Sequence, residues 1–431
     1  MTANNVLPPS EHIQSFRGDR LPTGDSHGPS PRRGRLSSKV TPRVLLAWHR
    51  FGPYHHARAA AAAARFHLTA LEISSVDFAG DWTPLTERPA IPLQTLCPGE
   101  NVDEVPIGIL RVRLARTLSR LRPDVVAVHG YATRSALLLI EYALAHACPI
   151  VLMSDSTDHD KPRQVLRERV KARVVRLAAA GLTSGRVGAA YLARLGLPEE
   201  RVFLGYDTVD NSHFSRPRRS SAPALGQAEK PYFLASARFI EAKNHLRLLD
   251  AYAHYRLKCL GPPFDLVILG DGAFRPRMTA RISSLGLSDF VSLPGFKEYD
   301  ELPDWYAAAA CLIQPSISET WGLVVNEAMA AGLPVLVSNR CGCAPELVRE
   351  GVNGFTFDPY NVESIAELMH RMAHGNVDRL AMGRASQEII ADWGPERFAD
   401  GLESAARAAL AAPLPQPAAL DKALLWALLQ R

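Results

Sequence analysis

Short apolar runs alternate with helical patterns over most of the chain. Residues 43–48 (RVLLAW), 124–128 (DVVAV) and 264–269 (FDLVIL) have the length and the branched, apolar composition of strands buried on both faces. Stretches with helical spacing follow such runs, as in the alanine-rich residues 57–66. Strands that alternate with helices need crossover connections, and these favour parallel pairing. The pattern therefore predicts an α/β protein with open parallel sheets.

One stretch with the composition of a linker divides this alternation. Residues 215–230 (SRPRRSSAPALGQAEK) are rich in proline, serine and charge, and they lack apolar periodicity. Residues 1–41 share this character, so we expect a disordered basic arm there. The predicted organisation is the arm, an N-terminal domain at 42–214, the linker, a C-terminal domain at 231–394, a helix at 395–412 and a tail at 413–431.

Composition limits the size and the compartment. The 431 residues suffice for two domains, and the 47% apolar content fits a sizeable core. The formal net charge of +5 is too small to indicate binding to nucleic acid. No run approaches the roughly 18 to 20 apolar residues of a spanning helix, and the N-terminal sequence lacks the apolar core of a secretory signal. We therefore expect a cytoplasmic protein.

The chain after the predicted strand 311–314 carries two carboxylates. Glu319 lies in a polar loop, and Asn326 opens a predicted helix over 327–331, which places Glu327 in its first turn. Open parallel sheets bind ligands just outside the carboxyl ends of their strands. A carboxylate can accept two hydroxyl hydrogens at once, which suits the vicinal diols of a ribose or a pyranose.

Backbone amides between the two acids suit an anion. Trp321, Gly322, Leu323 and Val324 precede the predicted helix, and N–H groups at a helix N-terminus bind phosphate oxygens. Two diol-binding acids beside a phosphate site together predict a site for a nucleotide sugar.

The same stretch resembles a known protein family. SETWGLVVNEAMAAGLPV, at residues 318–335, is similar to the E-x7-E signature of the retaining glycosyltransferases of family 4, which adopt the GT-B fold. The resemblance covers roughly residues 43–411. It implies two Rossmann-like domains facing a cleft, with the donor in the second domain and the acceptor in the first. It also implies that the helix at 395–412 returns to the first domain.

The resemblance assigns further residues in the second domain. Arg238 and Lys243 stand at the family's R-x4-K position, where their cations and nearby helix N–H groups converge on a diphosphate. Gly270 and Gly272 form a G-x-G loop that lies near the nucleotide in the family. The dinucleotide-binding fingerprint is not met, because Arg275 stands where its third glycine is required.

Two residues of the first domain are candidates on the same grounds. Gly52 follows the strand 43–48, in a loop that approaches the acceptor and the diphosphate in the family; a turn that requires glycine is the alternative. His129 follows the strand 124–128 and matches the position of a histidine near the transferred sugar. The alternative is a loop histidine whose hydrogen bonds are satisfied by its neighbours.

Acidic residues follow the predicted strand at 149–153. We expect Asp155 to bind hydroxyl groups of the acceptor. Asp158 and Asp160 fit the D-x-D metal motif of the other large glycosyltransferase fold. That pattern is weak, and the rhythm of strands and helices favours GT-B. We therefore expect neither a metal ion nor another cofactor.

The activity implied by the resemblance is transfer of a sugar from a nucleotide diphosphate sugar to an acceptor hydroxyl, with the anomeric configuration retained. Glu319 would orient the sugar hydroxyls, Glu327 the ribose, and His129 the sugar from the opposite wall. Arg238 and Lys243 would stabilise the charge that develops on the diphosphate.

The expected setting is the synthesis of a cell-surface polysaccharide or a glycolipid, with a glycan or a lipid-linked acceptor. Two alternatives stay open. One is a sugar-nucleotide isomerase on the same fold, such as a 2-epimerase. The other is a non-catalytic subunit that binds a nucleotide sugar.

Basic residues cluster on two predicted helices of the first domain, at 111–122 and 161–176. The apolar stripe of the second helix includes Val165, Leu166 and Val174. Because each basic residue near an anionic bilayer contributes about 1 kcal/mol, the clustering predicts contact with an anionic membrane at its inner face. The alternative is that the cations only solvate helices whose apolar stripes pack on the sheet.

Overall fold

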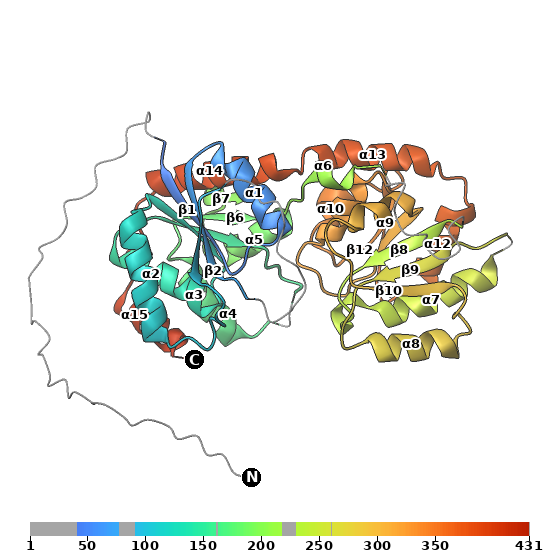
Figure 1. Ribbon diagram of the computed structural model, residues 1–431, viewed down its shortest axis with the longest axis horizontal. Helices are drawn as coiled ribbons and strands as arrows, with labels where there is room; N and C mark the ends of the chain where they lie inside the picture. Colours follow the sequence, from blue (N-terminus) through green and yellow to red (C-terminus); the bar gives the residue numbers. More distant parts are fainter. Residues whose placement is uncertain (1–40, 77–90, 161–162, 218–229, 260, 431) are drawn as a thin grey trace, which may run out of the picture. The chain divides into compact units, whose positions relative to one another are not determined.

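The chain forms two parallel sheets with helices on both faces of each (Figure 1). The computed structural model describes residues 41–76, 91–160, 163–217, 230–259 and 261–430. All of the predicted arm except its last residue, and most of the predicted linker, lie outside these residues. The predicted α/β class with parallel sheets is confirmed.

The first sheet has the strand order β3-β2-β1-β4-β5-β6-β7 within the described residues, and each pair is parallel. Its strands are β1 (Arg43–Trp48), β2 (His67–Ser74), β3 (Leu93–Cys97), β4 (Val125–His129), β5 (Ile150–Ser154), β6 (Ala180–Thr183) and β7 (Val202–Leu204). Between them run α1 (Pro53–Ala63), α2 (Ile107–Leu121), α3 (Arg134–Ala145), α4 (Val165–Val175), α5 (Arg186–Arg194) and the short helix η1 (Glu199–Arg201). We call this sheet and these helices the first lobe.

The second sheet has the order β10-β9-β8-β11-β12-β13 and is also parallel throughout. Its strands are β8 (Tyr232–Ser236), β9 (Asp265–Leu269), β10 (Val291–Gly295), β11 (Cys311–Gln314), β12 (Val335–Ser338) and β13 (Gly354–Phe357). Its helices are α6 (Asn211–Phe214), η2 (Glu241–Lys243), α7 (His245–Lys258), α8 (Arg275–Ser284), α9 (Leu302–Ala308), α10 (Leu323–Ala330), α11 (Ala344–Leu347), α12 (Val362–His374) and α13 (Arg379–Ala391). This sheet with its helices is the second lobe.

Successive residues of each central strand enter different hydrophobic cores. In β1, Leu45 and Ala47 pack among residues of α2 and α3, whereas Val44 and Leu46 pack among residues of α1 and of a later helix, α14. Because both faces of the sheet are covered, the strands need apolar residues at every position. This explains the uninterrupted apolar runs in the sequence.

Two C-terminal helices pack on opposite faces of the first sheet. α14 (Pro395–Ala411) leaves the second lobe and places Phe398 and Leu402 in the core that contains α1. α15 (Ala419–Leu429) adds Leu425 and Leu429 to the core on the other face, beside α3 and α4 (Figure 1). None of the helices that the structure describes is long and apolar enough to span a membrane.

The predicted apolar stripe of α4 is wrong at the start of the helix. Val165 and Leu166 are 70% and 73% exposed, and full burial begins only at Val174. Nearby, the Glu168 carboxylate accepts a hydrogen bond from the Tyr191 hydroxyl of α5 at 2.9 Å. The first turns of α4 thus contact α5 through a polar group and leave Val165 and Leu166 exposed.

Candidate active site

Two loops meet at the centre of the second sheet. β8 and β11 are neighbours there, and their connections run toward opposite edges of the sheet. The loop after β8 carries Arg238 and Lys243, and the loop after β11 carries Glu319. Such a switch in strand order opens a crevice at the carboxyl ends of the strands. It brings together residues that are far apart in the sequence.

The helix that carries Glu327 begins earlier than predicted. α10 starts at Leu323, with Gly322 before it at φ 108°, so the predicted start at Asn326 and Glu327 is wrong. The left-handed conformation of Gly322, which other residues adopt only with strain, turns the loop into the helix. Asn326 is buried instead, and its Oδ1 accepts a hydrogen bond from Trp321 Nε1 at 2.9 Å. Glu327 therefore lies one turn further into the helix.

Glu319 is held by three polar neighbours. Lys243 Nζ donates a hydrogen bond to Glu319 Oε2 and forms an ion pair with it. Gln314 Nε2 donates to the same oxygen at 3.0 Å, and Ser316 Oγ donates at 3.3 Å. The side chains of Lys243 and Glu319 are each 14% exposed, so both are reachable from the crevice.

Glu327 is bound by one tyrosine from each lobe. The Tyr54 hydroxyl, on α1, donates to Glu327 Oε1 at 2.7 Å, and the Tyr306 hydroxyl, on α9, donates to Oε2 at 2.6 Å. Burial raises the pKa of Glu327, although the two hydrogen bonds oppose that shift. Burial and the nearby carboxylate raise the pKa of both tyrosines, which therefore act as donors.

The N-terminus of α10 faces the same space. Leu323 and Val324 are its first residues, and no side chain caps it. Amide groups in the first turn of a helix lack partners within the helix, so they can bind an anion. Arg238, exposed in the loop after β8, lines the same space.

These groups line one cavity of about 300 Å³. This volume is at the lower end of the range for small-molecule sites, about 300–1,000 Å³. The predicted site residues that line the cavity are Arg238, Lys243, Glu319, Glu327, Asp155, Trp321, Gly322, Leu323 and Val324. Those that do not line it are Gly52, His129, Gly270 and Gly272.

The first lobe contributes Asp155 to the cavity. Thr320 Oγ1, from the second lobe, donates to Asp155 Oδ2 at 3.0 Å. Burial raises the pKa of Asp155 to about 6; Asp207 and, to a smaller extent, Asp160 add to the shift, and the Thr320 hydrogen bond opposes it. Asp207 forms an ion pair with Arg58 at 3.2 Å. The cavity thus contains a carboxyl group that titrates near neutral pH.

The other two candidates of the first lobe lie next to β1 and β4. His129 ends β4, and its Nε2 lies 3.2 Å from Ser135 Oγ. Burial lowers the pKa of His129 to about 4, so the ring is neutral at physiological pH. Gly52 precedes α1 with φ −94°, and a Cβ there would have no atom closer than His55 Nδ1 at 3.7 Å. The backbone at Gly52 therefore does not require glycine, and the turn alternative fails.

Gly270 and Gly272 do not line the cavity but allow close packing of a neighbouring loop. Their φ angles are 120° and 148°, which only glycine adopts readily. A Cβ at Gly270 would lie 2.0 Å from the Ala237 carbonyl oxygen, and one at Gly272 would lie 2.7 Å from the Phe239 oxygen. The two glycines let the loop after β9 pack against the loop that carries Arg238.

The acids of the D-x-D alternative are engaged by arginines. Asp158 forms an ion pair with Arg194, and Asp160 forms one with Arg163. In the part of the chain that the structure describes, no group of three or more histidine, cysteine, aspartate or glutamate side chains is arranged to hold a metal ion. Independence of the reaction from metal stays a prediction.

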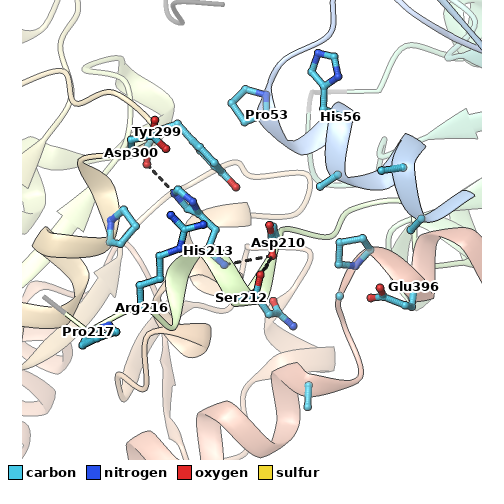
Figure 2. Close-up of a pocket in the computed structure, with 18 of the residues that line it drawn as sticks. Pro53, His56, Asp210, Ser212, His213, Arg216, Pro217, Tyr299, Asp300 and Glu396 are labelled. Atoms are coloured by element: carbon cyan, nitrogen blue, oxygen red, sulfur yellow. Dashed lines mark hydrogen bonds between the residues drawn. The ribbon is translucent and has the colours of Figure 1, made fainter. Parts of the chain in front are cut away.

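A larger cavity of about 900 Å³ lies between α1, α6 and the start of α14 (Figure 2). Its polar groups include Asp210, which accepts hydrogen bonds from the Ser212 and His213 amides at the start of α6. The His213 ring stacks on Tyr299 with centroids 3.9 Å apart. The residues that line this cavity include none of the predicted site residues.

Sequence reasoning missed Tyr54, Tyr306 and Asp207. Tyr54 is 273 residues from Glu327, and no spacing or local pattern connects the two. One signal was present in the sequence, since Tyr54 directly follows the loop at the carboxyl end of the first predicted strand.

Comparisons with known proteins agree with this architecture. Residues 218–389 match the family described as glycosyl transferases group 1. The crystal structure of Anabaena Alr3699/HepE in complex with UDP and glucose superposes with a TM-score of 0.67 at 20% identity, over 84% of this chain and 98% of that one. At this identity the likeness concerns the fold, and it confirms the predicted GT-B architecture.

Two relatives show the extent of the sequence similarity. Sulfoquinovosyl transferase SQD2 of Arabidopsis thaliana is 27% identical over 317 residues, which cover 69% of this chain and 59% of that protein. D-inositol 3-phosphate glycosyltransferase of Thermobifida fusca is 32% identical over 222 residues, which cover 51% of this chain and 45% of that protein. The chain thus spans about half the length of these relatives.

Proposed function

We propose that this chain, in which residues 218–389 match the glycosyl transferases group 1, is a retaining hexosyltransferase. It transfers a sugar from a nucleotide diphosphate sugar to an acceptor hydroxyl. The observation that carries this proposal is the single cavity that joins the Lys243–Glu319 pair, the Glu327 carboxylate and the uncapped start of α10. Two carboxylates beside an anion site match the diols and the diphosphate of such a donor.

Each group has a proposed role that follows from its place. The diphosphate lies against the Leu323 and Val324 amides, with Arg238 and Lys243 as counter-charges. Glu319 lies next to Lys243 and therefore orients the sugar hydroxyls closest to the phosphate. Glu327 binds the ribose hydroxyls, and His129 contacts the sugar from the first lobe when the lobes close on the donor.

The chemical step breaks the bond between the anomeric carbon and the diphosphate oxygen and forms a bond from the same carbon to the acceptor oxygen. The acceptor attacks from the face that the diphosphate leaves, and its proton passes to a departing phosphate oxygen. The anomeric configuration is then retained. Arg238, Lys243 and the amides at the start of α10 stabilise the charge that develops on the diphosphate. Because these groups supply positive charge, the step needs no metal ion, and excess chelator should leave turnover unchanged.

We infer that the acceptor is a glycan or is linked to a lipid. We also infer that the enzyme is cytoplasmic and works at the inner face of the membrane. The start of α4 supports this placement, because Val165 and Leu166 are exposed beside the exposed cations Arg167 and Arg169. α4 begins at the carboxyl edge of the first sheet, the edge from which Asp155 enters the cavity.

The structure of α2 supports the membrane placement less strongly than its basic sequence suggested. Arg111 forms an ion pair with Glu141 at 2.9 Å, and Arg113 pairs with Glu100. Cations held by acidic neighbours contribute less to binding an anionic surface. The product in this setting is a cell-surface polysaccharide or a glycolipid.

A panel of nucleotide sugars tests the proposed function. The melting temperature of the full chain is measured with UDP-, GDP- and ADP-linked sugars, because a ligand that binds the folded state stabilises it. One of these classes should raise the melting temperature of the wild type, and this rise should be lost in Lys243→Ala. If no class changes the melting temperature, the proposed function is wrong.

Analysis of the reaction products separates the alternatives. The isomerase alternative has one feature in its favour: the buried Glu327 and the partly buried Asp155 line the same cavity, an arrangement that suits proton transfer as well as binding. If the bound nucleotide sugar is converted to an epimer without any acceptor, the isomerase replaces the transferase. If it is bound but never consumed with any acceptor, the chain is a binding subunit.

A further inference from the structure

Both carboxylate oxygens of Glu327 already accept a hydrogen bond, although Glu327 is the residue proposed to bind a ribose. Tyr54 and Tyr306 occupy Oε1 and Oε2, and Glu327 itself is 2% exposed. A vicinal diol on this carboxylate would also place one hydroxyl on each oxygen. The two tyrosines therefore present the same hydrogen-bond donors as the ligand, at the same two atoms.

The two tyrosines differ in where they stand. Tyr306 is fully buried in the second lobe, in the core that also contains residues of α10, and it does not line the cavity. Tyr54 is half-buried, belongs to the first lobe and lines the cavity directly. A ligand entering the cavity reaches Oε1 by replacing Tyr54, whereas Tyr306 stays behind the carboxylate and holds it in place.

Tyr54 does not line the larger cavity, but two residues beside it do. Its ring packs edge-on against Tyr299, with centroids 5.7 Å apart, and the adjacent Pro53 and Tyr299 both line that cavity (Figure 2). The larger cavity therefore begins at residues that flank Tyr54. Rotation about the side-chain bonds of Tyr54 can move the hydroxyl off Glu327 without unfolding the start of α1.

We propose that Tyr54 is a placeholder for a ribose hydroxyl, exchanged for the ligand when a nucleotide binds. Tyr54 then lowers the affinity for the nucleotide and couples its arrival to the contact between the lobes. This inference rests on the proposed function, because it needs a ribose-containing ligand in the cavity.

The size of the effect follows from the bond that is exchanged. We expect a change of about tenfold in the binding constant, which corresponds to about 1.4 kcal/mol, because one hydrogen bond to a charged group is exchanged for another. Tyr54→Phe keeps the ring and its contact with Tyr299 but removes the competing hydroxyl. This variant should bind a ribonucleoside diphosphate about tenfold more tightly than the wild type.

Isothermal titration of the full chain at pH 8 tests the exchange. The probes are UDP, GDP and ADP, followed by the 2′,3′-dideoxy form of whichever nucleotide binds. Tyr54→Phe should tighten binding of the ribonucleotide and leave binding of the dideoxy form unchanged, since a ligand without the diol need not displace Tyr54. Tyr306→Phe is the matched control; it removes the other hydroxyl on Glu327 and should not tighten binding.

The outcomes are distinct. Equal or weaker binding of the ribonucleotide by Tyr54→Phe, or equal tightening for the dideoxy form, would overturn the placeholder role while the proposed function stands. Tyr54→Leu removes the hydroxyl with a different side chain and must give the same tightening if Tyr54→Phe fails to fold. If the wild type binds none of the three nucleotides, the proposed function fails and the placeholder role fails with it.

Discussion

Lys243 and Glu319 are paired at the wall of the small cavity, outside the apolar cores. Because they contribute little to packing, Lys243→Ala and Glu319→Ala should unfold close to the wild-type temperature. Each should lose about 10² or more in rate, the scale for a preorganised electrostatic contact. Melting curves and initial rates on the same samples check this, with Lys422→Ala, an exposed lysine of α15, as the control. A fall in melting temperature that matches the fall in rate would make the pair structural.

Asp155 should give the reaction a pH dependence near 6. Its pKa is raised, so the carboxyl group is neutral below about pH 6 and charged above it. If the charged form accepts a hydrogen bond from the hydroxyl group of the acceptor substrate, kcat/KM for that substrate rises as the pH increases through about 6. Because the folded protein binds this proton more tightly than the unfolded chain, stability contributed by Asp155 is lost as the pH rises from about 4 to about 6.

Asp155→Asn should remove both effects. A rate profile and a series of melting temperatures between pH 4 and pH 8 measure them in the wild type and in the variant. The assignment to Asp155 is wrong if the limb near pH 6 persists in Asp155→Asn, and Asp207 then becomes the group to replace.

The site residues that were predicted from the sequence are linked by local spacing or by resemblance, whereas those that were missed depend on contacts between distant segments. Glu319 and Glu327 lie within one loop and helix, so their spacing in the sequence carries the information. Arg238 and Lys243 were assigned by resemblance, and strand order places them beside that loop. Tyr54 reaches Glu327 only because the two lobes meet, and no local sequence pattern predicts that contact.

At the scale of elements, the start of α4 is the clearest departure from the prediction. A helix beside a sheet was expected to bury one stripe, but Val165 and Leu166 are exposed beside Arg167 and Arg169. The pattern in the sequence could not show this, because burial depends on whether a neighbour covers the stripe. Likewise, α10 starts at Gly322 because of a backbone conformation, which hydrophobic periodicity does not encode.

The exposed start of α4 should bind anionic liposomes through Val165, Leu166, Arg167 and Arg169. Arginines near an anionic surface contribute about 1 kcal/mol each, and the interaction is screened over about 8 Å at physiological ionic strength. We expect sedimentation with anionic but not zwitterionic liposomes, and its loss at high salt. The double variant Arg167→Gln with Arg169→Gln should weaken binding.

A matched control uses two cations of the same helix that are already paired. Lys171 forms an ion pair with Glu168 at 2.8 Å, and Arg173 forms one with Asp421 at 2.7 Å. Replacing Lys171 and Arg173 by glutamine should weaken liposome binding less than replacing Arg167 and Arg169. No binding of the wild type at low salt would contradict the membrane placement and favour a soluble acceptor.

At the level of the whole molecule, residues of the two lobes contact each other outside the cavity as well. The Arg186 amide donates to Glu346 Oε1 at 2.8 Å, and the Arg186 guanidinium pairs with the same carboxylate. Gly185 lies directly against the second lobe, since a Cβ there would be 2.7 Å from the Trp321 ring. The fold could be predicted because apolar runs and turns are local, but such contacts between lobes could not.

Gly185→Ala should therefore hold the lobes apart. Trp321 stacks on Trp393 and has little room to yield. We expect a rate loss of roughly tenfold to a hundredfold, the scale for misplacing reacting groups by about 1 Å. Stabilisation by the donor should persist, because most of the residues proposed to bind the donor belong to the second lobe. The control is Gly108→Ala, where a Cβ would have no atom within 4 Å. Equal rates for the two variants would show that this contact is not needed.

The anomeric configuration of the product distinguishes a retaining transferase from an inverting one and from an isomerase. Once the panel has identified the donor, proton NMR can follow the reaction of the full chain with that donor and an acceptor from its first minutes. A retaining transferase should form a new glycosidic bond with the same anomeric configuration as the donor, and Lys243→Ala should form it at least about a hundredfold more slowly. A product of inverted configuration, or conversion of the donor to an epimer without any acceptor, would contradict the proposed function.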